Sequence, residues 1–274
     1  NIAAFHLQAE TTKNTSRYGK PATVLEPIEN NFQKIFPLLS DEKDILQLEL
    51  IKKWSLDKYK HVLPQIKQRK AKGFIRNCHG DMHLANIALL DSKITIFDCI
   101  EFNDALRWID VISEIAFTCM DLIDRHRPDF ASRLLDRYLQ RTGDYAGLGL
   151  LQFYQVYRAM VRAKVAIIQA SETKLTKPEK QRALLRYREY ADLAVTFTQP
   201  HPQTLFITYG VSGSGKSTLT QPLLEKFNLI RLRSDVERKR LFGLPAEAQT
   251  DAATKQKIYS EKASQHTFDH LLST

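Results

Sequence analysis

The spacing of apolar residues changes along the chain and predicts helices first, then short strands, then helices again. Residues from about 30 to 70 mix polar and apolar side chains and are largely free of glycine, which favours helix. Between residues 74 and 98 the apolar residues form short runs, and Asp91-Ser92-Lys93 between the last two runs indicates a hairpin turn. After this segment the helical spacing returns.

Two sets of apolar residues at helical spacing predict two buried helix faces. They are Trp108, Val111, Ile112, Ile115, Cys119 and Leu122 in one helix, and Tyr154, Tyr157, Val161, Val165 and Ile168 in another. Residues with this periodicity usually face the core. We therefore expect their aromatic rings to pack in the core rather than to form a platform for a ligand.

A segment with two prolines, Thr198-Gln199-Pro200-His201-Pro202-Gln203, interrupts the helical pattern. Proline does not continue a helix, and the segment favours an extended linker over residues 199–203. The run from Thr204 to Tyr209 then predicts a short buried strand. The pattern accordingly divides the chain into a domain over residues 1–198 and a second domain over residues 204–274.

Composition narrows the class of protein further. The chain has 274 residues, 43% of them hydrophobic, which suits one large domain or two ordinary ones. No run approaches the roughly 18 apolar residues of a membrane helix, so no membrane association is expected. Cys78, Cys99 and Cys119 show no metal-binding spacing. They indicate a reducing, cytoplasmic setting and are expected to be small core side chains.

The net charge of +9 is spread over both parts of the chain, with +6 in residues 1–198 and +3 in residues 199–274. The densest basic cluster consists of Arg231, Arg233, Arg238, Lys239 and Arg240. Attraction to anionic ligands such as ATP explains this charge as well as nucleic acid does. Nucleic acid therefore stays a possible partner but not the favoured one.

A first phosphate-handling motif runs from His79 to Asn86 with the sequence HGDMHLAN, and Asp98 follows at the end of an apolar run. Phosphoryl transfer needs a carboxylate that orients the attacking hydroxyl and oxygen ligands for Mg²⁺. Asp81 and Asn86 have the offset of the kinase pattern H-R-D-x-x-x-x-N. Asn86 and Asp98 supply hard oxygen ligands of the kind that Mg²⁺ prefers.

This stretch resembles the aminoglycoside phosphotransferase branch of the protein-kinase-like fold, in which Gly replaces the Arg after the first His and a second His, here His83, often follows. The resemblance covers residues 1–195. It implies Asp81 as catalytic base, Asn86 and Asp98 as Mg²⁺ ligands, and Asp110 as a brace for the catalytic loop. We expect the two histidines to hold the loop by hydrogen bonds, and no zinc site.

The resemblance also implies an N-terminal lobe with a glycine-rich loop that covers the phosphates. Only Gly19 and Gly73 precede the first motif, and the 78 residues before it favour helix. We therefore expect residues 1–198 to form the mostly helical C-terminal lobe alone, without its N-terminal lobe.

A second motif, from Gly210 to Thr218 with the sequence GVSGSGKST, is a complete P-loop match. Its glycines let backbone N–H groups surround the phosphates of ATP, while Lys216 reaches the β- and γ-phosphates and Ser217 binds Mg²⁺. The expected phosphate-binding residues are Gly210, Ser212, Gly213, Ser214, Gly215, Lys216, Ser217 and Thr218. A helix after the loop would add its N-terminal dipole.

The segment after the P-loop resembles small P-loop kinases of the gluconate and polynucleotide types. A second strand over residues 228–233 is expected to lead to Asp235, which in such kinases contacts the phosphate acceptor, with Arg238 assisting. The alternative is that Ser234 or Asp235 is the N-cap of a helix. No Walker B strand follows Lys239, and residues 250–272 predict a single amphipathic helix. We therefore expect residues 204–274 to form the N-terminal part of an α/β P-loop kinase domain.

The order of the two modules resembles bacterial bifunctional proteins with an aminoglycoside-phosphotransferase-like part and an AAA-type ATP-binding part. The resemblance implies an ATP- and Mg²⁺-dependent phosphotransferase that acts on a hydroxyl of a small molecule. The segments 98–104 and 107–110 are closer to that group than to resistance enzymes. Two alternatives stay open: a regulatory or nucleic-acid-end-processing ATPase with a scaffold lobe, and a nucleotide-binding protein without turnover.

Overall fold

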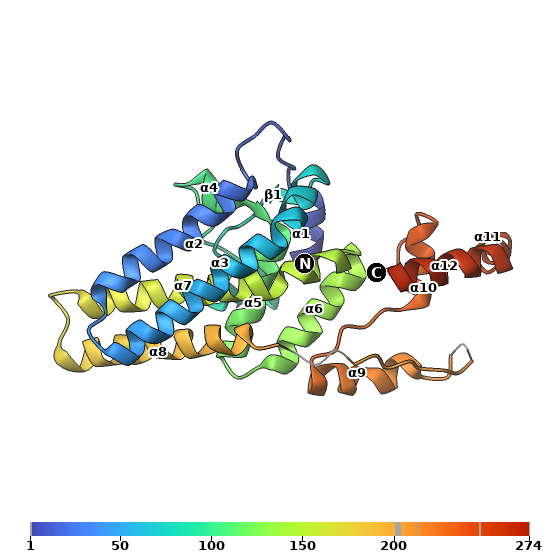
Figure 1. Ribbon diagram of the computed structural model, residues 1–274. Coiled ribbons are helices and arrows are strands. Elements are labelled where there is room, and N and C mark those ends of the chain that lie inside the picture. Colours follow the sequence, from blue (N-terminus) through green and yellow to red (C-terminus); the bar gives the residue numbers. More distant parts are fainter. Residues whose placement is uncertain (1, 201–203, 212, 247, 274) are drawn as a thin grey trace. The chain divides into compact units, whose positions relative to one another are not determined.

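The computed structural model describes residues 2–200, 204–211, 213–246 and 248–273 and is a mixed α/β structure that is mostly helical (Figure 1). The chain divides into two compact units. The larger unit consists of Gln8–Arg127 and Leu148–Phe206, and the smaller unit of Asn1–Leu7, Pro128–Gly147 and Ile207–Thr274. Among the described residues, no helix has the length and apolar character that crossing a membrane requires.

The larger unit is built around helix α7, which packs against α2, α3, α5 and α8. The helices of this unit are α2 (Pro21–Ile35), α3 (Glu42–Ala71), α4 (Asp104–Arg107), α5 (Val111–Asp124), α7 (Leu148–Ser171) and α8 (Lys177–Thr198), with 3-10 turns at Phe36–Leu38 and Leu84–Asn86. Asp41 caps α3 by accepting a hydrogen bond from Lys43 N, and Glu179 at the start of α8 accepts one from Thr176 N. Such caps satisfy N–H groups that have no partner within the helix.

Four short strands of the larger unit carry the first motif. Strand β1 (Ile75–Asn77) pairs antiparallel with β4 (Trp108–Asp110), and β2 (Ile87–Leu90) pairs antiparallel with β3 (Lys93–Ile96). The turn between β2 and β3 has positive φ angles at Asp91 (47°) and Ser92 (61°), which suits a two-residue hairpin. The predicted hairpin turn is confirmed.

The first predicted helix face is confirmed except at its start. Trp108 lies in β4, and the helix begins only at Val111. The side chain of Asp110 accepts a hydrogen bond from Ile112 N and thereby fixes this helix start. The other predicted members are buried.

The second predicted face is wrong in the C-terminal half of α7. Val165 and Ile168 are 50% and 40% exposed, whereas Ala163, Ala166 and Ile167 are buried. Helix α8 packs along α7 and buries alanines of its own, which are Ala183, Ala191 and Ala194. Small side chains permit close helix packing, so the contact follows the alanines rather than the larger β-branched residues.

The smaller unit contains α6 (Pro128–Thr142), a 3-10 turn (Tyr145–Gly147), α9 (Lys216–Phe227), α10 (Ser234–Leu241), α11 (Ala252–Ile258) and α12 (Glu261–Ser273), while α1 (Ile2–Gln8) begins in this unit. The amphipathic helix expected over residues 250–272 is therefore two helices. Ser260 Oγ accepts a hydrogen bond from Ala263 N and starts the second one.

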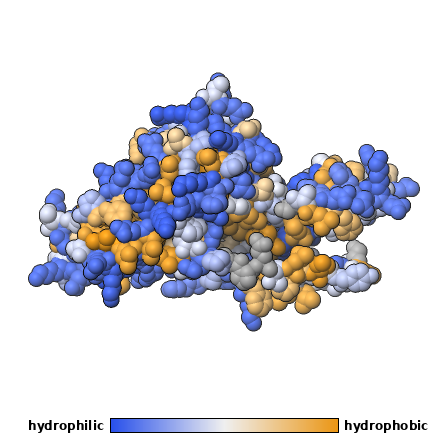
Figure 2. Space-filling view, in the orientation of Figure 1, coloured by the Kyte–Doolittle hydropathy of each residue, from blue (hydrophilic) through white to orange (hydrophobic). Residues whose placement is uncertain are grey.

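The strands expected at residues 204–209 and 228–233 are not formed in the described part of the chain. Leu205 and Ile207 are each 83% exposed, so the first segment is also not buried. A strand needs a neighbour for its backbone N–H and C=O groups, and the described residues provide none here. Figure 2 shows apolar side chains exposed around α9, among them Leu219 and Phe227.

Helix α8 ends at Thr198, and the backbone of Gln199 is extended. The expected linker therefore begins directly after this helix. Residues 201–203 lie outside the described residues, so the linker and the domain boundary stay predictions. The largest difference between the compact units and the sequence division is in the middle of the chain. Residues 128–147, which include α6, belong with the P-loop part.

Candidate functional site

The catalytic-loop motif lies between β1 and β2, and the structure brings its chemical groups together. Asn86 Nδ2 donates hydrogen bonds to the backbone oxygen of Asp81 at 3.0 Å and to its Oδ2 at 3.2 Å. The backbone of Asn86 accepts a hydrogen bond from Phe97 N at 3.1 Å. Asp98 follows Phe97 in the chain. The structure therefore joins Asn86 to Asp81 by hydrogen bonds and brings Asp98 near them through the backbone alone.

Asp98 has an unusual backbone conformation. Its φ angle is 61°, in the left-handed region that residues other than glycine rarely adopt. Such conformations cost of order 1–3 kcal/mol and concentrate at functional sites. The side chain is exposed, which leaves its carboxylate accessible to a ligand.

His79 and His83 hold the loop, as expected from the sequence. His79 Nδ1 accepts a hydrogen bond from Asp81 N at 3.3 Å, and its Nε2 bonds to the Phe97 oxygen at 2.7 Å. His83 Nδ1 accepts from Ala85 N at 3.2 Å, while its Nε2 lies 3.4 Å from Asp81 Oδ2. The two histidines therefore fix both the backbone and the carboxylate of Asp81.

The acid that braces the loop is Glu114, which sequence reasoning missed. Its carboxylate accepts hydrogen bonds from His79 N at 3.1 Å and from Gly80 N at 2.6 Å, and the residue is fully buried. Helical side chains point toward the N-terminus, so Glu114 on the first turn of α5 reaches back to the loop. The sequence contained one indication of this role, which is an acidic residue within the otherwise apolar run of α5.

Asp110, which the resemblance implied as the brace, has a different partner. Its two carboxylate oxygens accept hydrogen bonds from Arg69 on α3 at 2.7 and 2.8 Å, and both residues are buried. This expectation is wrong, because the carboxylate of Asp110 is occupied by Arg69 and by the start of α5. Asp110 therefore ties the helix before the loop to the helix after it.

Arg158 of α7 supports the opposite side of the loop. Its guanidinium donates to the Gly80 oxygen at 3.0 Å and to Ser113 Oγ at 3.1 Å. Gly80 has a φ angle of 88°, and a Cβ there would lie 2.7 Å from the Leu106 oxygen. Only glycine fits this close approach, which explains its place beside Asp81.

The environment of Asp81 keeps its carboxyl group ionised. Burial alone would raise its pKa, but the hydrogen bond and charge of His83 outweigh burial, with help from Arg158 and Arg162. The net result is a pKa below the ordinary value. Its side chain is 36% exposed, so the carboxylate is accessible from solvent.

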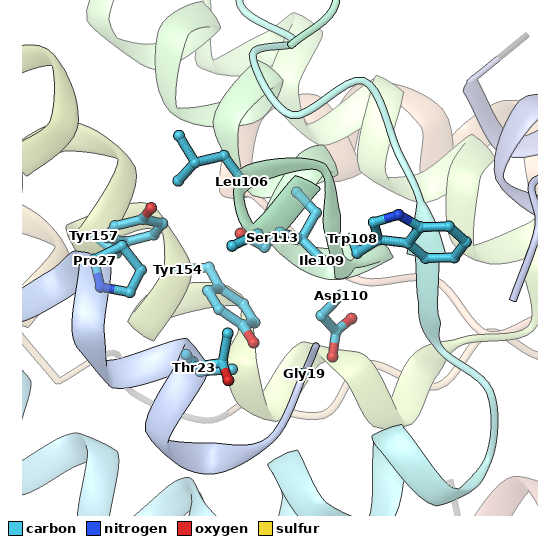
Figure 3. A pocket seen from close by; sticks show the side chains of 12 residues that line it. Gly19, Thr23, Pro27, Leu106, Trp108, Ile109, Asp110, Ser113, Tyr154 and Tyr157 are labelled. Atoms are coloured by element: carbon cyan, nitrogen blue, oxygen red, sulfur yellow. The ribbon is translucent and has the colours of Figure 1, made fainter. Parts of the chain in front are cut away.

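A pocket with aromatic walls lies next to the catalytic loop in the larger unit (Figure 3). It has a volume of about 30 Å³, and its apolar walls include Pro27, Leu106, Trp108, Tyr154 and Tyr157. Leu106 also approaches Gly80, and the lining residue Ser113 shares Arg158 with the loop. Tyr154 and Tyr157 are buried as expected, yet they also line this pocket.

The second motif forms an exposed loop at the start of α9. Lys216 Nζ donates to the oxygens of Gly210 and Val211, both at 2.7 Å, and so crosses the loop. Gly213 and Gly215 have φ angles of 79° and 80°, and a Cβ on either would meet no atom within 4 Å. Their role is therefore conformational freedom rather than space. Ser214, Ser217 and Thr218 are exposed, while Ser212 lies outside the described residues.

The predicted acceptor-binding residues of the second module lie in different environments. Asp235 is hydrogen-bonded to Tyr259 and lies 3.1 Å from Lys239, and these contacts outweigh burial and lower its pKa. Arg238 is buried and donates to the Ile258 oxygen at 2.9 Å and to Ser264 Oγ at 3.0 Å. Its guanidinium thus fastens the ends of α11 and α12 to α10.

The capping alternative for this segment is wrong. Helix α10 begins at Ser234, and its N-cap is Arg233, whose side chain makes no capping bond. Ser234 and Asp235 are the first two helical residues, where an acid favours the helix dipole. Asp235 therefore stabilises α10 by its charge and not as a cap.

Comparison with known proteins identifies the C-terminal part of the chain. Residues 205–273 match the protein family described as AAA domain, so this part is a P-loop nucleotide-binding domain of the kinase or ATPase type. No solved structure is significantly similar to the chain.

Curated relatives of the chain are mycobacterial. They include the uncharacterized protein Rv2004c of Mycobacterium tuberculosis and the uncharacterized protein Mb2027c of Mycobacterium bovis. Each is 35% identical to this chain over 173 residues, which is 63% of the chain and 34% of the relative. The chain therefore spans about a third of the length of the curated relatives that it matches.

Proposed function

We propose that the chain is part of an ATP-dependent phosphotransferase that acts on a hydroxyl group of a small molecule. The observation that carries this proposal is the hydrogen-bonded pair of Asp81 and Asn86 on a loop held by two histidines, Glu114 and Arg158. Asp98 follows the residue whose N–H bonds to the backbone oxygen of Asn86. An ionised carboxylate on a fixed loop suits a base that orients a hydroxyl for attack.

In this proposal Asp81 accepts the proton of the acceptor hydroxyl as its oxygen attacks the γ-phosphorus of ATP. The bond from the γ-phosphorus to the β–γ bridging oxygen breaks, and ADP leaves with that electron pair. Asn86 and Asp98 fit a magnesium ion, because Asn86 uses its amide nitrogen for Asp81 and so keeps its oxygen for a cation. The ion supplies neutralisation of the charge on the phosphate oxygens.

The aromatic pocket is the site that we propose for the acceptor, and because its volume is about 30 Å³, its walls would have to open to admit a small molecule. Among its described lining residues the carboxylate is that of Asp110, which is already bonded to Arg69. A polycationic aminoglycoside would need unpaired carboxylates, whereas aromatic walls favour a neutral molecule with an apolar part. The pocket therefore supports an acceptor other than an aminoglycoside.

The P-loop domain is the place that we propose for a second ATP, held by Lys216 and with Ser217 as Mg²⁺ ligand. This second ATP either phosphorylates another acceptor, with Asp235 as its contact, or regulates the first site. The buried position of Arg238 favours a supporting role for that residue over direct contact with an acceptor.

The test measures ADP release by the full-length protein over a panel of hydroxyl acceptors, with Asp81→Asn and Lys216→Ala compared side by side. Loss of acceptor-dependent turnover by at least about 100-fold in Asp81→Asn alone is the expected result, since general base catalysis contributes 10²–10⁴-fold. Full activity of this variant would refute the proposal. Loss in Lys216→Ala alone would assign the chemistry to the P-loop domain.

A further inference from the structure

The basic cluster at residues 231–240 does not form a continuous basic surface. Arg231 bonds to Asp136 at 2.7 Å, Lys239 lies 3.1 Å from Asp235, and Arg240 bonds to Glu237 at 2.7 Å. Arg238 is buried against α11 and α12. The fifth residue, Arg233, lines a cavity instead, and this cavity has no assigned role.

The cavity lies within the smaller unit, between α6 and the start of α10, and has a volume of about 320 Å³. Its described lining residues are Arg137, Gln140, Arg141, Arg233, Val236 and Ala246. Half of them are arginines and none of these six is acidic. We infer that this cavity binds the phosphate group of a small phosphorylated molecule.

The arginines come to the cavity from two segments. Arg137 and Arg141 are four residues apart on α6 and therefore lie on the same helix face. Arg233 brings a third guanidinium from another segment to the same cavity. A phosphate accepts the paired hydrogen bonds that guanidinium groups donate best.

One of these arginines is held in place before a ligand binds. Arg233 donates to Gln140 Oε1 at 3.3 Å, and Gln140 Nε2 in turn donates to Asp136 Oδ2 at 2.7 Å. Asp136 also binds Arg231, whose guanidinium donates to the Ser217 oxygen at 3.1 Å. Residues 231 and 233 share one side of an extended segment, so this network links the cavity to the first turn after the P-loop.

The size of the cavity favours a phosphate ester over a bare phosphate ion. A volume of about 320 Å³ is in the range of small-molecule pockets, and Val236 and Ala246 offer apolar contacts to an organic group. Nucleic acid is less well suited, because the neighbouring basic residues that could follow a phosphate backbone are bonded within the unit.

The test is calorimetric titration of the 274-residue chain carrying Lys216→Ala, which removes the lysine of the P-loop from phosphate binding. The probes are inorganic phosphate, ribose 5-phosphate and a single-stranded oligothymidylate of about 12 nucleotides. We expect ribose 5-phosphate to bind more tightly than phosphate. Adding Arg137→Gln or Arg233→Gln should weaken both by about tenfold, since each removes a charge-assisted hydrogen-bond donor.

Arg182→Gln, at an exposed position of α8 in the larger unit, is the matched control and should leave binding unchanged. A thermal melt of each variant shows whether the fold is kept. The inference fails if ribose 5-phosphate does not bind at millimolar concentration, or if all arginine variants bind it equally. It also fails if the oligonucleotide binds far more tightly than ribose 5-phosphate with a steep salt dependence, because that result identifies a nucleic-acid surface. None of these outcomes depends on Asp81 or on turnover.

Discussion

Single residues outside the recognised motifs determine the geometry of the loop from His79 to Asn86. Glu114 satisfies two backbone N–H groups at the position where the loop turns, and Arg158 satisfies the Gly80 oxygen from the other side. Buried backbone groups without partners are costly, so these two side chains make the loop conformation stable. The motif supplies the reactive groups, while α5 and α7 supply their support.

The role of Glu114 leads to a prediction about stability and activity. Glu114→Ala leaves the N–H groups of His79 and Gly80 without this acceptor, at a cost of about 1–3 kcal/mol for each group. We expect urea denaturation to show a loss of about 2–6 kcal/mol in the free energy of unfolding. Turnover should fall even under conditions in which the protein stays folded, because Asp81 loses its fixed position.

Glu114→Gln separates these two effects, since the amide keeps an acceptor oxygen and should recover most of the stability but not all of the turnover. Glu172→Gln, at an exposed position of the same unit, is the control. An alanine variant with unchanged stability would show that Glu114 does not brace the loop.

The three cysteines differ in burial, and this gives a prediction about their reactivity. Burial raises the pKa of Cys119 to about 12 and the pKa of Cys78 well above its ordinary value, whereas Cys99 is exposed. The thiolate is the reactive form, and a raised pKa removes it at neutral pH. Cys99 corrects the expectation that all three are core residues.

We therefore expect iodoacetamide at pH 8 to alkylate Cys99 in the native protein and all three cysteines after unfolding in urea. Mass spectrometry of tryptic peptides gives the extent at each position. Cys99→Ser should remove native-state labelling. Alkylation of Cys78 at the rate of Cys99 would contradict its burial beneath the loop.

At the scale of elements, the sequence predicted those turns and helices whose formation depends on neighbouring residues. The Asp91-Ser92-Lys93 turn, the helices up to residue 71 and the P-loop helix all depend on residues close together in the sequence. Each follows from turn chemistry or periodicity alone. These elements could therefore be predicted without knowledge of the fold.

Elements that depend on distant partners were predicted less well. Trp108 continues the helical spacing of α5, yet it pairs with β1, and Asp110 starts the helix two residues later. Residues 204–209 have the composition of a buried strand but lack a neighbour among the described residues. In the C-terminal half of α7, packing against the alanines of α8 determines which residues are buried. In each case a contact far away in the sequence outweighed the local pattern.

At the scale of the whole molecule, the sequence indicated two phosphate-handling modules but gave no sign that α6 belongs with the P-loop part. Several contacts within the smaller unit make this association, and three of them are the following. Arg133 pairs with Glu225 at 2.9 Å, Ser132 donates to Asn228 at 2.7 Å, and Asp136 binds Arg231. Helix α6 is joined by the chain to α5 and α7 of the larger unit, so it connects the two modules covalently.

This arrangement predicts that ATP binding at the P-loop reduces the backbone motion of α6. Arg231 contacts both the Ser217 oxygen on α9 and Asp136 on α6, so ordering the start of α9 should also order the middle of α6. We expect ATP to slow hydrogen exchange over residues 128–142 by several-fold, measured by mass spectrometry. Lys216→Ala should abolish the effect. Arg231→Gln should abolish the slowing in α6 but keep it in α9, because it breaks the connection and leaves the phosphate loop intact. If ATP slowed hydrogen exchange in α9 of the unmodified protein but left exchange in α6 unchanged, ATP binding at the P-loop would not be coupled to α6.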